Sequence, residues 1–248
     1  MVTDIDLTAT VAPLHGSQPL HAVLATPDGA GPWPGVLLVH EAWGLDEEML
    51  KHARRLAAAG YLTLAVDLYS AGGTRRCLVS TMRAMLKGEG RAFADIEAGR
   101  RWLTESADCT GRIGVIGFCM GGGFALLTVH SGFDAASANY AFLPKQLDDA
   151  MADACPVVAS YGGRDRGLRG AAAKLDDALT RAGVVHDVRE YPAAGHAFLN
   201  EEESGPRWLR PLLRATHAGP EPAAAADGWR RIEAFFAEHL TGSSDRSP

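Results

Sequence analysis

The sequence predicts an α/β fold with a mostly parallel central sheet and helices on both of its faces. Two observations lead to this prediction. Short apolar runs rich in β-branched residues alternate with amphipathic segments of helical period along most of the chain. One such run, at 112–116, is followed by a glycine-bounded turn and then by an apolar segment that begins a helix. Parallel strands need crossover connections of this kind.

The elements follow in chain order from these patterns. Strands are predicted at 20–26, 35–40, 62–66, 112–116, 135–141, 156–161 and 184–191. The run 35–40 is almost wholly apolar, which is typical of a strand buried on both faces. Helices are predicted at 46–59, 78–87, 91–105, 168–182 and 229–240.

The chain shows no internal repeat and no linker long enough to separate domains. We therefore expect a single domain over residues 1–248. Residues 201–226 are a polar, proline- and alanine-rich excursion, and residues 241–248 are expected to form a disordered tail.

Composition excludes several classes of function. The formal net charge of −6 leaves no basic surface for nucleic acid. No apolar run reaches the roughly 18 residues of a membrane span, and the acidic start is unlike a secretory signal. The 4 irregularly spaced cysteines indicate reduced thiols and a cytoplasmic protein. No pattern indicates a metal or another cofactor, so the expected partner is a small-molecule substrate. Whether the protein is a monomer or a homodimer stays open.

Cys119 is the residue on which the predicted chemistry depends. It occupies the centre of Gly117-x-Cys119-x-Gly121, a nucleophile elbow with sulfur in place of the usual serine oxygen. A sharp strand-to-helix reversal strains the central residue and requires small neighbours. It also places the sulfur beside a helix N-terminus, which favours a thiolate. The alternatives are a buried structural cysteine and a nucleotide-binding turn. The second lacks the P-loop lysine and the spaced G-x-G-x-x-G pattern.

Two further candidates, Asp165 and His196, follow later strands. Asp165 ends Gly-Gly-Arg-Asp after the strand at 156–161, and His196 follows a glycine after the last strand. The carboxyl ends of parallel strands meet at one edge of a sheet, so these groups are expected to converge. The order nucleophile, acid, histidine is one of the known triad orders. His40 and His186 compete with His196, but neither follows a glycine-rich loop at a strand end.

Five segments together carry a family resemblance. Residues 39–45, 67–69, 117–122, 162–165 and 194–198 resemble dienelactone hydrolase, a cysteine-dependent branch of the α/β-hydrolase superfamily. The resemblance covers roughly residues 20–200, and the terminal helix fits it too. It implies the α/β-hydrolase fold and an enzyme that hydrolyses ester or lactone bonds without a cofactor.

The resemblance also implies roles for individual residues. Cys119 would attack the carbonyl to give a thioester, with His196 as general base and acid and Asp165 orienting the imidazole. Backbone N–H groups of Met120 and Ala42 would hold the oxyanion. In the family, the glutamate that matches Glu41 contacts the resting thiol and is proposed to accept its proton. The alternative for Glu41 is an ordinary charge near a helix.

The substrate pocket departs from the family pattern. Family members grip a substrate carboxylate with arginines, one of them four residues after the catalytic histidine. This chain has Asn200 there, followed by three glutamates. The second family arginine should lie in the connection after residues 67–69, and Arg83 is one of the arginines in that connection. Candidate pocket residues are Trp43, Tyr69, Phe118, Phe198, Arg75 and Arg76. The alternatives are a carboxylesterase or thioesterase acting on neutral acyl esters, and a non-catalytic binding protein. No role is predicted for Cys77, Cys109 or Cys155.

Overall fold

A computed structural model describes residues 1–206 and 208–241, and its centre is a mixed sheet in the strand order β1-β2-β4-β3-β5-β6-β7-β8. Strands β1 and β2 are antiparallel to their neighbours, and all later strands are parallel. The predicted fold class is confirmed. The strands are β1 (Val2–Asp6), β2 (His21–Ala25), β3 (Trp33–Val39), β4 (Leu62–Asp67), β5 (Cys109–Phe118), β6 (Ala135–Asn139), β7 (Val157–Gly162) and β8 (His186–Tyr191).

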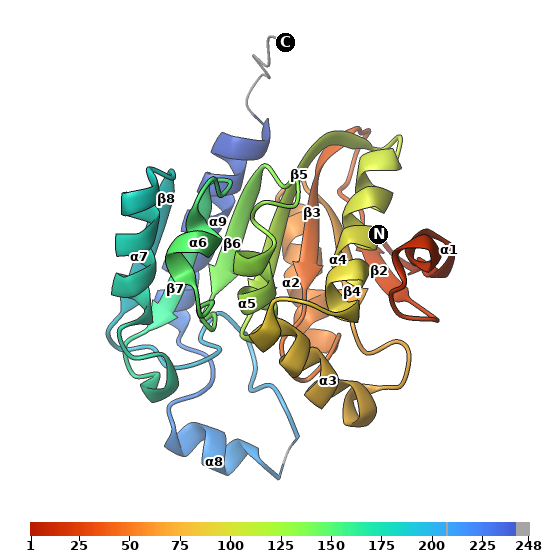
Figure 1. Cartoon of the computed structure of the whole chain (residues 1–248). Helices are drawn as coiled ribbons and strands as arrows, with labels where there is room; N and C mark the ends of the chain where they lie inside the picture. The colour runs from red at the N-terminus through yellow and green to blue at the C-terminus, as the bar shows by residue number, and fades with distance from the viewer. Residues whose placement is uncertain (207, 242–248) are drawn as a thin grey trace.

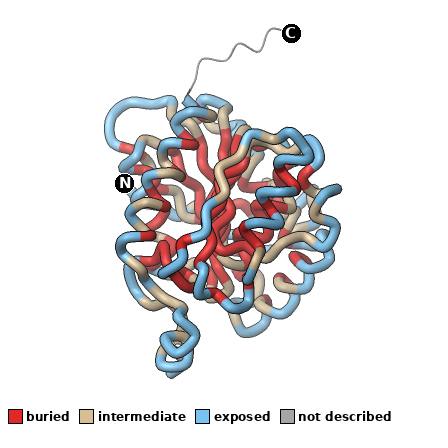
Figure 2. The backbone as a smooth tube through the Cα atoms, turned by 90° about the vertical axis from the view of Figure 1, so that its left-hand side faces the viewer, coloured by how far each residue is buried: buried red, intermediate tan, exposed pale blue. Residues whose placement is uncertain are grey.

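Helices cover both faces of the sheet (Figure 1). Helices α4 and α5 pack on one face of the central strands, and α2 and α9 pack on the other. Figure 2 shows that the buried residues run through the middle of the molecule along the strands. The helices are α1 (Thr8–Val11), α2 (Glu47–Ala58), α3 (Thr74–Lys87), α4 (Arg91–Glu105), α5 (Met120–Leu127), α6 (Leu147–Met151), α7 (Ala171–Ala182), α8 (Arg210–Ala215) and α9 (Pro222–Thr241).

The ends of the chain differ most from the predicted elements. Strand β1 was not expected, because its sequence Val-Thr-Asp-Ile-Asp has neither an apolar run nor a strict alternation, and four of its five residues are exposed at the sheet edge. Helix α9 begins earlier than predicted, inside the stretch expected to be an irregular excursion. That stretch also holds α8, which Figure 1 shows projecting from the body of the protein.

Two other predictions concern the chain's end and the membrane. Of the tail predicted at 241–248, all but Thr241 lies outside the described residues. Across 1–206 and 208–241, no helix combines the length and apolar character that a bilayer crossing would require.

The parallel strands bring the candidate residues to one edge of the sheet. Glu41 follows β3, Cys119 follows β5, Asp165 follows β7 and His196 comes after β8. Strand β3 pairs with β5, and β7 pairs with β8. The loops after these strands therefore meet at the carboxyl edge of the sheet, where open α/β folds place their sites.

Candidate active site

The backbone at Cys119 has the strained geometry of a nucleophile elbow. Its φ of 53° and ψ of −112° lie outside the regions that L-residues prefer, and Cys119 directly precedes α5. A Cβ atom on Gly117 would lie 1.9 Å from the Gly121 carbonyl oxygen, and one on Gly121 would lie 2.1 Å from the Val39 carbonyl oxygen. Glycine at both positions is therefore what allows the strand, turn and helix to pack this closely.

His196 lies between the acid and the sulfur. Its Nδ1 is 2.5 Å from Asp165 Oδ2, and its side chain is 26% exposed. Burial disfavours the imidazolium, but the Cys119 sulfur and the Asp165 carboxylate outweigh it and raise the pKa of His196 to about 10. The site therefore favours a charged imidazolium beside the sulfur.

Both carboxylate oxygens of Asp165 have partners. Its Oδ1 accepts a hydrogen bond from the Gly167 N–H at 3.0 Å. Burial acts to raise the pKa of Asp165, yet the hydrogen bond to His196 and the backbone donors keep that pKa below its usual value. The carboxylate stays ionised and oriented toward the imidazole.

Glu41 is almost wholly buried, with 2% exposure. Burial raises the pKa of its carboxyl to about 7, although hydrogen bonding from Ser204, the charge of His196 and the Asn200 side chain oppose the rise. A contact between Glu41 and the Cys119 thiol is not among the interactions seen within the described residues. The sulfur interacts instead with His196.

Tyr69 contacts both segments that form the candidate oxyanion site. Its hydroxyl donates to the Ala42 carbonyl oxygen at 3.0 Å and lies 3.7 Å from Met120 Sδ. Met120 is the first residue of α5, so its N–H has no acceptor within its own helix. Tyr69 thus ties together the two segments whose N–H groups are the predicted oxyanion donors.

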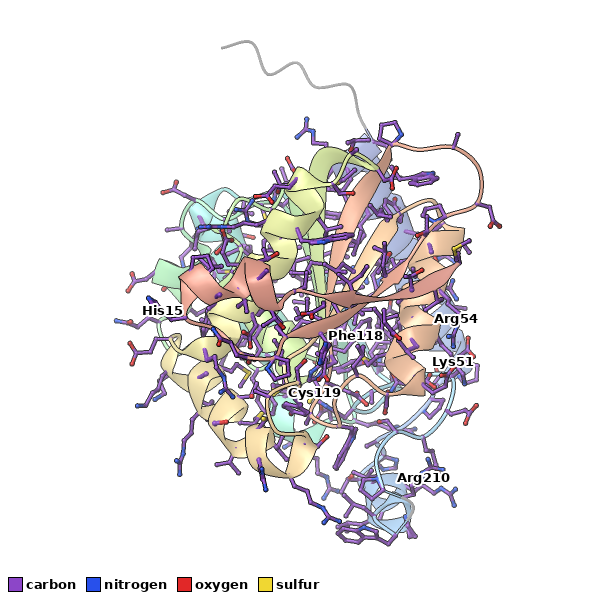
Figure 3. All side chains as sticks on the ribbon, turned by 90° about the vertical axis from the view of Figure 1, so that its right-hand side faces the viewer. His15, Lys51, Arg54, Phe118, Cys119 and Arg210 are labelled. Carbon is purple, nitrogen blue, oxygen red and sulfur yellow. The ribbon has the colours of Figure 1, made fainter. Side chains whose placement is uncertain are left out.

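A cavity of about 110 Å³ opens above Cys119 and His196. Five of its eleven lining residues come from the segment 203–219, which the sequence left without a role. Figure 3 shows Cys119 at the end of the sheet that faces this segment, with Arg210 on the segment itself. The lining residues are Glu41, Ala42, Trp43, Cys119, His196, Ala197, Glu203, Ser204, Leu213, Ala218 and Gly219.

The segment 203–219 is attached to the body at both of its ends. On one side, Lys51 Nζ lies 2.7 Å from the carboxylate of Glu202. On the other, the Gly219 N–H donates to the His196 carbonyl oxygen at 2.8 Å. Between these points, Arg214 forms an ion pair with Glu203 within the segment. Sequence reasoning missed Ser204 and Leu213 because this stretch has no periodicity that predicts which side chains face inward.

Only Trp43 among the six predicted pocket residues lines the catalytic cavity. Phe118 and Phe198 are fully buried in the core, where Phe118 stacks on His52 and Phe198 packs on Tyr140. Tyr69 is buried as well, with its hydroxyl against Ala42 and Met120. The remaining two candidates are arginines in the first turn of α3. Arg75 lines an adjoining groove of about 500 Å³, whereas Arg76 is exposed and lines neither space.

No group of three or more His, Cys, Asp or Glu side chains suited to a metal ion occurs among residues 1–206 and 208–241.

Glu41→Gln is expected to stabilise the fold above neutral pH. Between pH 4.5 and about 7 the folded protein keeps a proton on Glu41 that the unfolded chain has already lost, so stability falls as pH rises. That difference corresponds to at most about 3 kcal/mol at pH 8. Urea unfolding at pH 4 should therefore show little difference between variant and wild type, and unfolding at pH 8 should favour the variant. A difference that is constant across this range would contradict the raised pKa.

Comparisons with known proteins show the family to which the chain belongs. Residues 20–240 match the dienelactone hydrolase family. Two proteins named "Putative carboxymethylenebutenolidase" are similar: one from Methylorubrum extorquens is 33% identical over 88% of this chain and 76% of its own, and one from Yersinia pestis is 31% identical over 93% and 87%. A crystal structure named "Putative Dienelactone Hydrolase" from Klebsiella pneumoniae superposes with a TM-score of 0.73 at 26% identity, covering 96% and 98% of the two chains. The chain belongs to the dienelactone hydrolase family and is a hydrolase of lactone or ester bonds.

Proposed function

We propose that this hydrolase works through a Cys119–His196–Asp165 triad and a thioester acyl-enzyme. The observation that carries the proposal is the contact of His196 with both partners, the sulfur on the strained elbow and the carboxylate at 2.5 Å. A nucleophile, a base and a group that orients the base are the parts that covalent acyl transfer needs.

Acylation begins at the sulfur. The Cys119 thiolate attacks the carbonyl carbon, and the carbonyl oxygen takes up the negative charge. The N–H groups of Met120 and Ala42 donate to that oxygen. As the C–O bond to the leaving group breaks, the His196 imidazolium gives its proton to the departing oxygen. With a lactone, that oxygen remains part of the acyl chain.

Deacylation uses the same groups in reverse. Neutral His196 removes a proton from a water molecule, whose oxygen attacks the thioester carbonyl. The C–S bond breaks, the acid leaves, and the thiolate–imidazolium pair is restored. Asp165 keeps the proton on His196 Nδ1 throughout, so Nε2 faces the reacting atoms. Glu41 is the second proton acceptor of the cavity, taking the thiol proton when the sulfur starts out protonated.

A neutral acyl ester is the second candidate substrate. The cavity is small, its wall includes Leu213, Ala218 and Ala42, and the carboxyl groups among its described lining residues are those of Glu41 and Glu203. Asn200, at the family's arginine position, is 2% exposed and does not line the cavity. A substrate carboxylate in this space would face the carboxyl groups of Glu41 and Glu203 as well as the His196 imidazolium, and none of the described lining residues is an arginine. An acidic substrate would have to extend toward Arg75 in the adjoining groove.

One experiment tests both points. The wild-type protein is mixed with p-nitrophenyl acetate or with cis-dienelactone and quenched in acid during turnover, and its proteolytic peptides are analysed by mass spectrometry. Steady-state kcat/KM is measured for both substrates. We expect an acetyl group on the peptide that contains Cys119, and a higher kcat/KM for the neutral ester. An acyl group on a different residue would overturn the mechanism. A clear preference for the lactone would reject the second candidate and direct attention to Arg75.

A further inference from the structure

A group of buried polar side chains lies beneath the catalytic cavity, and of its members the steps above use only Glu41. We call it the amide cluster: Asn200, His52, Tyr140 and Glu41. Each member is at most 2% exposed, and they come from four separate parts of the chain. His52 belongs to α2, Tyr140 follows β6, Glu41 follows β3, and Asn200 lies four residues beyond His196. Buried polar groups that converge in this way need each other's hydrogen bonds.

Two donors fix the direction of the Asn200 amide. His52 Nε2 lies 3.0 Å from Asn200 Oδ1, and the Tyr140 hydroxyl lies 3.3 Å from the same oxygen. Burial lowers the pKa of His52 to about 4, so its ring is neutral and can carry its single proton on Nε2. His52 is held by stacking on Phe118, with ring centroids 4.6 Å apart. With its oxygen occupied on this side, Asn200 must present its amide nitrogen on the other.

The other side of Asn200 faces Glu41. The Asn200 side chain favours the charged form of that carboxylate. Among the described residues, neither Asn200 Nδ2 nor Glu41 Oε1 has a partner at hydrogen-bond distance. One atom is a donor and the other an acceptor once Glu41 is ionised, so each supplies what the other lacks. A flipped amide would instead turn Oδ1 toward the carboxylate, and the two oxygens would repel each other.

Other charged and polar groups also face Glu41. Ser204 hydrogen-bonds to it from the segment 203–219, His196 attracts its charge, and Asp46 repels it. Tyr140, whose ring centroid lies 5.0 Å from that of His196, is close enough for the Glu41 charge to disfavour ionisation of its hydroxyl. Ser204 belongs to a surface segment, whereas Asn200 is anchored in the core by two hydrogen bonds. Asn200 is therefore the rigid donor of the pair.

We propose that Asn200 is a positioning residue for Glu41. Held by His52 and Tyr140, its amide N–H group receives the ionised Glu41 carboxylate and sets where that carboxylate lies relative to Cys119 and His196. The inference deepens the proposed function, because Glu41 matters only as a proton acceptor in the cavity. It does not require the thioester: the position and protonation of Glu41 exist in the resting protein.

The test measures the protonation of Glu41 directly. The full chain is labelled with ¹³C at glutamate side-chain carboxyl groups and titrated by NMR, and Glu41→Gln identifies the Glu41 signal. In Asn200→Leu the donor is lost, and in Asn200→Asp a second carboxylate faces Glu41 while oxygen is kept for His52 and Tyr140. Both changes should raise the titration midpoint of Glu41, by about one pH unit or more for Asn200→Asp. Ser204→Ala removes the other donor and serves as the comparison.

A second readout separates positioning from mere support of the fold. The pH profile of kcat/KM for p-nitrophenyl acetate should move with the NMR midpoint in Asn200→Asp. A midpoint unchanged from wild type in folded Asn200→Asp would overturn the proposal, even if thermal stability falls. Because the NMR titration needs no turnover, failure of the triad mechanism would leave its outcome readable. Conversely, a shifted midpoint with no acyl group on Cys119 would support the positioning role and reject the mechanism.

Discussion

Cys119→Ala is expected to reduce hydrolysis of p-nitrophenyl acetate by about 10⁴-fold or more while leaving the fold intact. Without sulfur, no covalent intermediate forms, and the oxyanion donors with His196 can accelerate only the direct attack of water. The measurement is kcat/KM alongside a thermal unfolding curve. The side chain of Cys119 lines the cavity and is only half-buried against the core, so its truncation should cost little stability.

Cys155→Ala is the matched control. Burial raises the pKa of the Cys155 thiol to about 12, so it holds its proton and cannot act as a nucleophile at neutral pH. Its removal should leave kcat/KM within about twofold of wild type, since the residue does not line the catalytic cavity. Retention of more than a tenth of wild-type activity by Cys119→Ala would show that a different residue attacks the substrate.

Cys119→Ser refines the same experiment. A serine hydroxyl is far less acidic than a thiol, so its proton is harder to remove during attack. We expect activity between that of wild type and that of the alanine variant. A serine variant as active as wild type would indicate that His196 removes a proton during attack, and would argue against a resting thiolate.

Gly117→Ala is expected to destabilise the protein by about 4 kcal/mol or more, enough to prevent recovery of folded protein. The added methyl group would lie 1.9 Å from the Gly121 carbonyl oxygen and 2.6 Å from the Gly122 nitrogen. Both neighbours are backbone atoms in the first turn of α5, so neither can rotate away as a side chain would. Relief would require the strand and helix to separate at the centre of the sheet.

The control for this prediction is Gly29→Ala. Gly29 lies in a surface turn with φ of 94°, and a methyl group there would meet nothing within 4 Å. Its cost is limited to the backbone conformation, about 1 kcal/mol. Urea unfolding of both variants measures the contrast. Equal destabilisation of the two would show that the elbow tolerates a Cβ and that its close packing is not what requires glycine.

The arrangement of the candidate site was predictable because it depends on strand order. Cys119, Asp165 and His196 each follow a predicted strand, and parallel strands end at one edge, so their convergence needed no knowledge of side-chain packing. Whether a side chain points into the cavity or into the core was not predictable in this way. Phe118 and Trp43 both lie next to the site in sequence, yet one packs into the core and the other lines the cavity. That difference is set by neighbours such as His52, which are remote in sequence.

The outer wall of the cavity was not predictable for a related reason. Leu213 and Ser204 lie in a stretch with neither helical nor strand period, and both line the cavity although α8, which carries Leu213, projects from the body of the protein. Asn200 gives a third case. The family resemblance indicated that asparagine stands where family members have an arginine. Only the structure shows that the asparagine oxygen is held in the core by His52 and Tyr140.

The attachment of the segment 203–219 bears on how this enzyme could be altered. Its described residues supply five of the eleven that line the cavity and include no strand, and Glu202 and Gly219 hold the segment to the body at either end. A different segment of similar span inserted between these two points would leave the elbow, Asp165 and the sheet in place, at the cost of the Ser204 hydrogen bond to Glu41. Substrate range and catalytic machinery are therefore separable by design, and a library confined to this one loop should yield new acyl preferences in proteins that still fold.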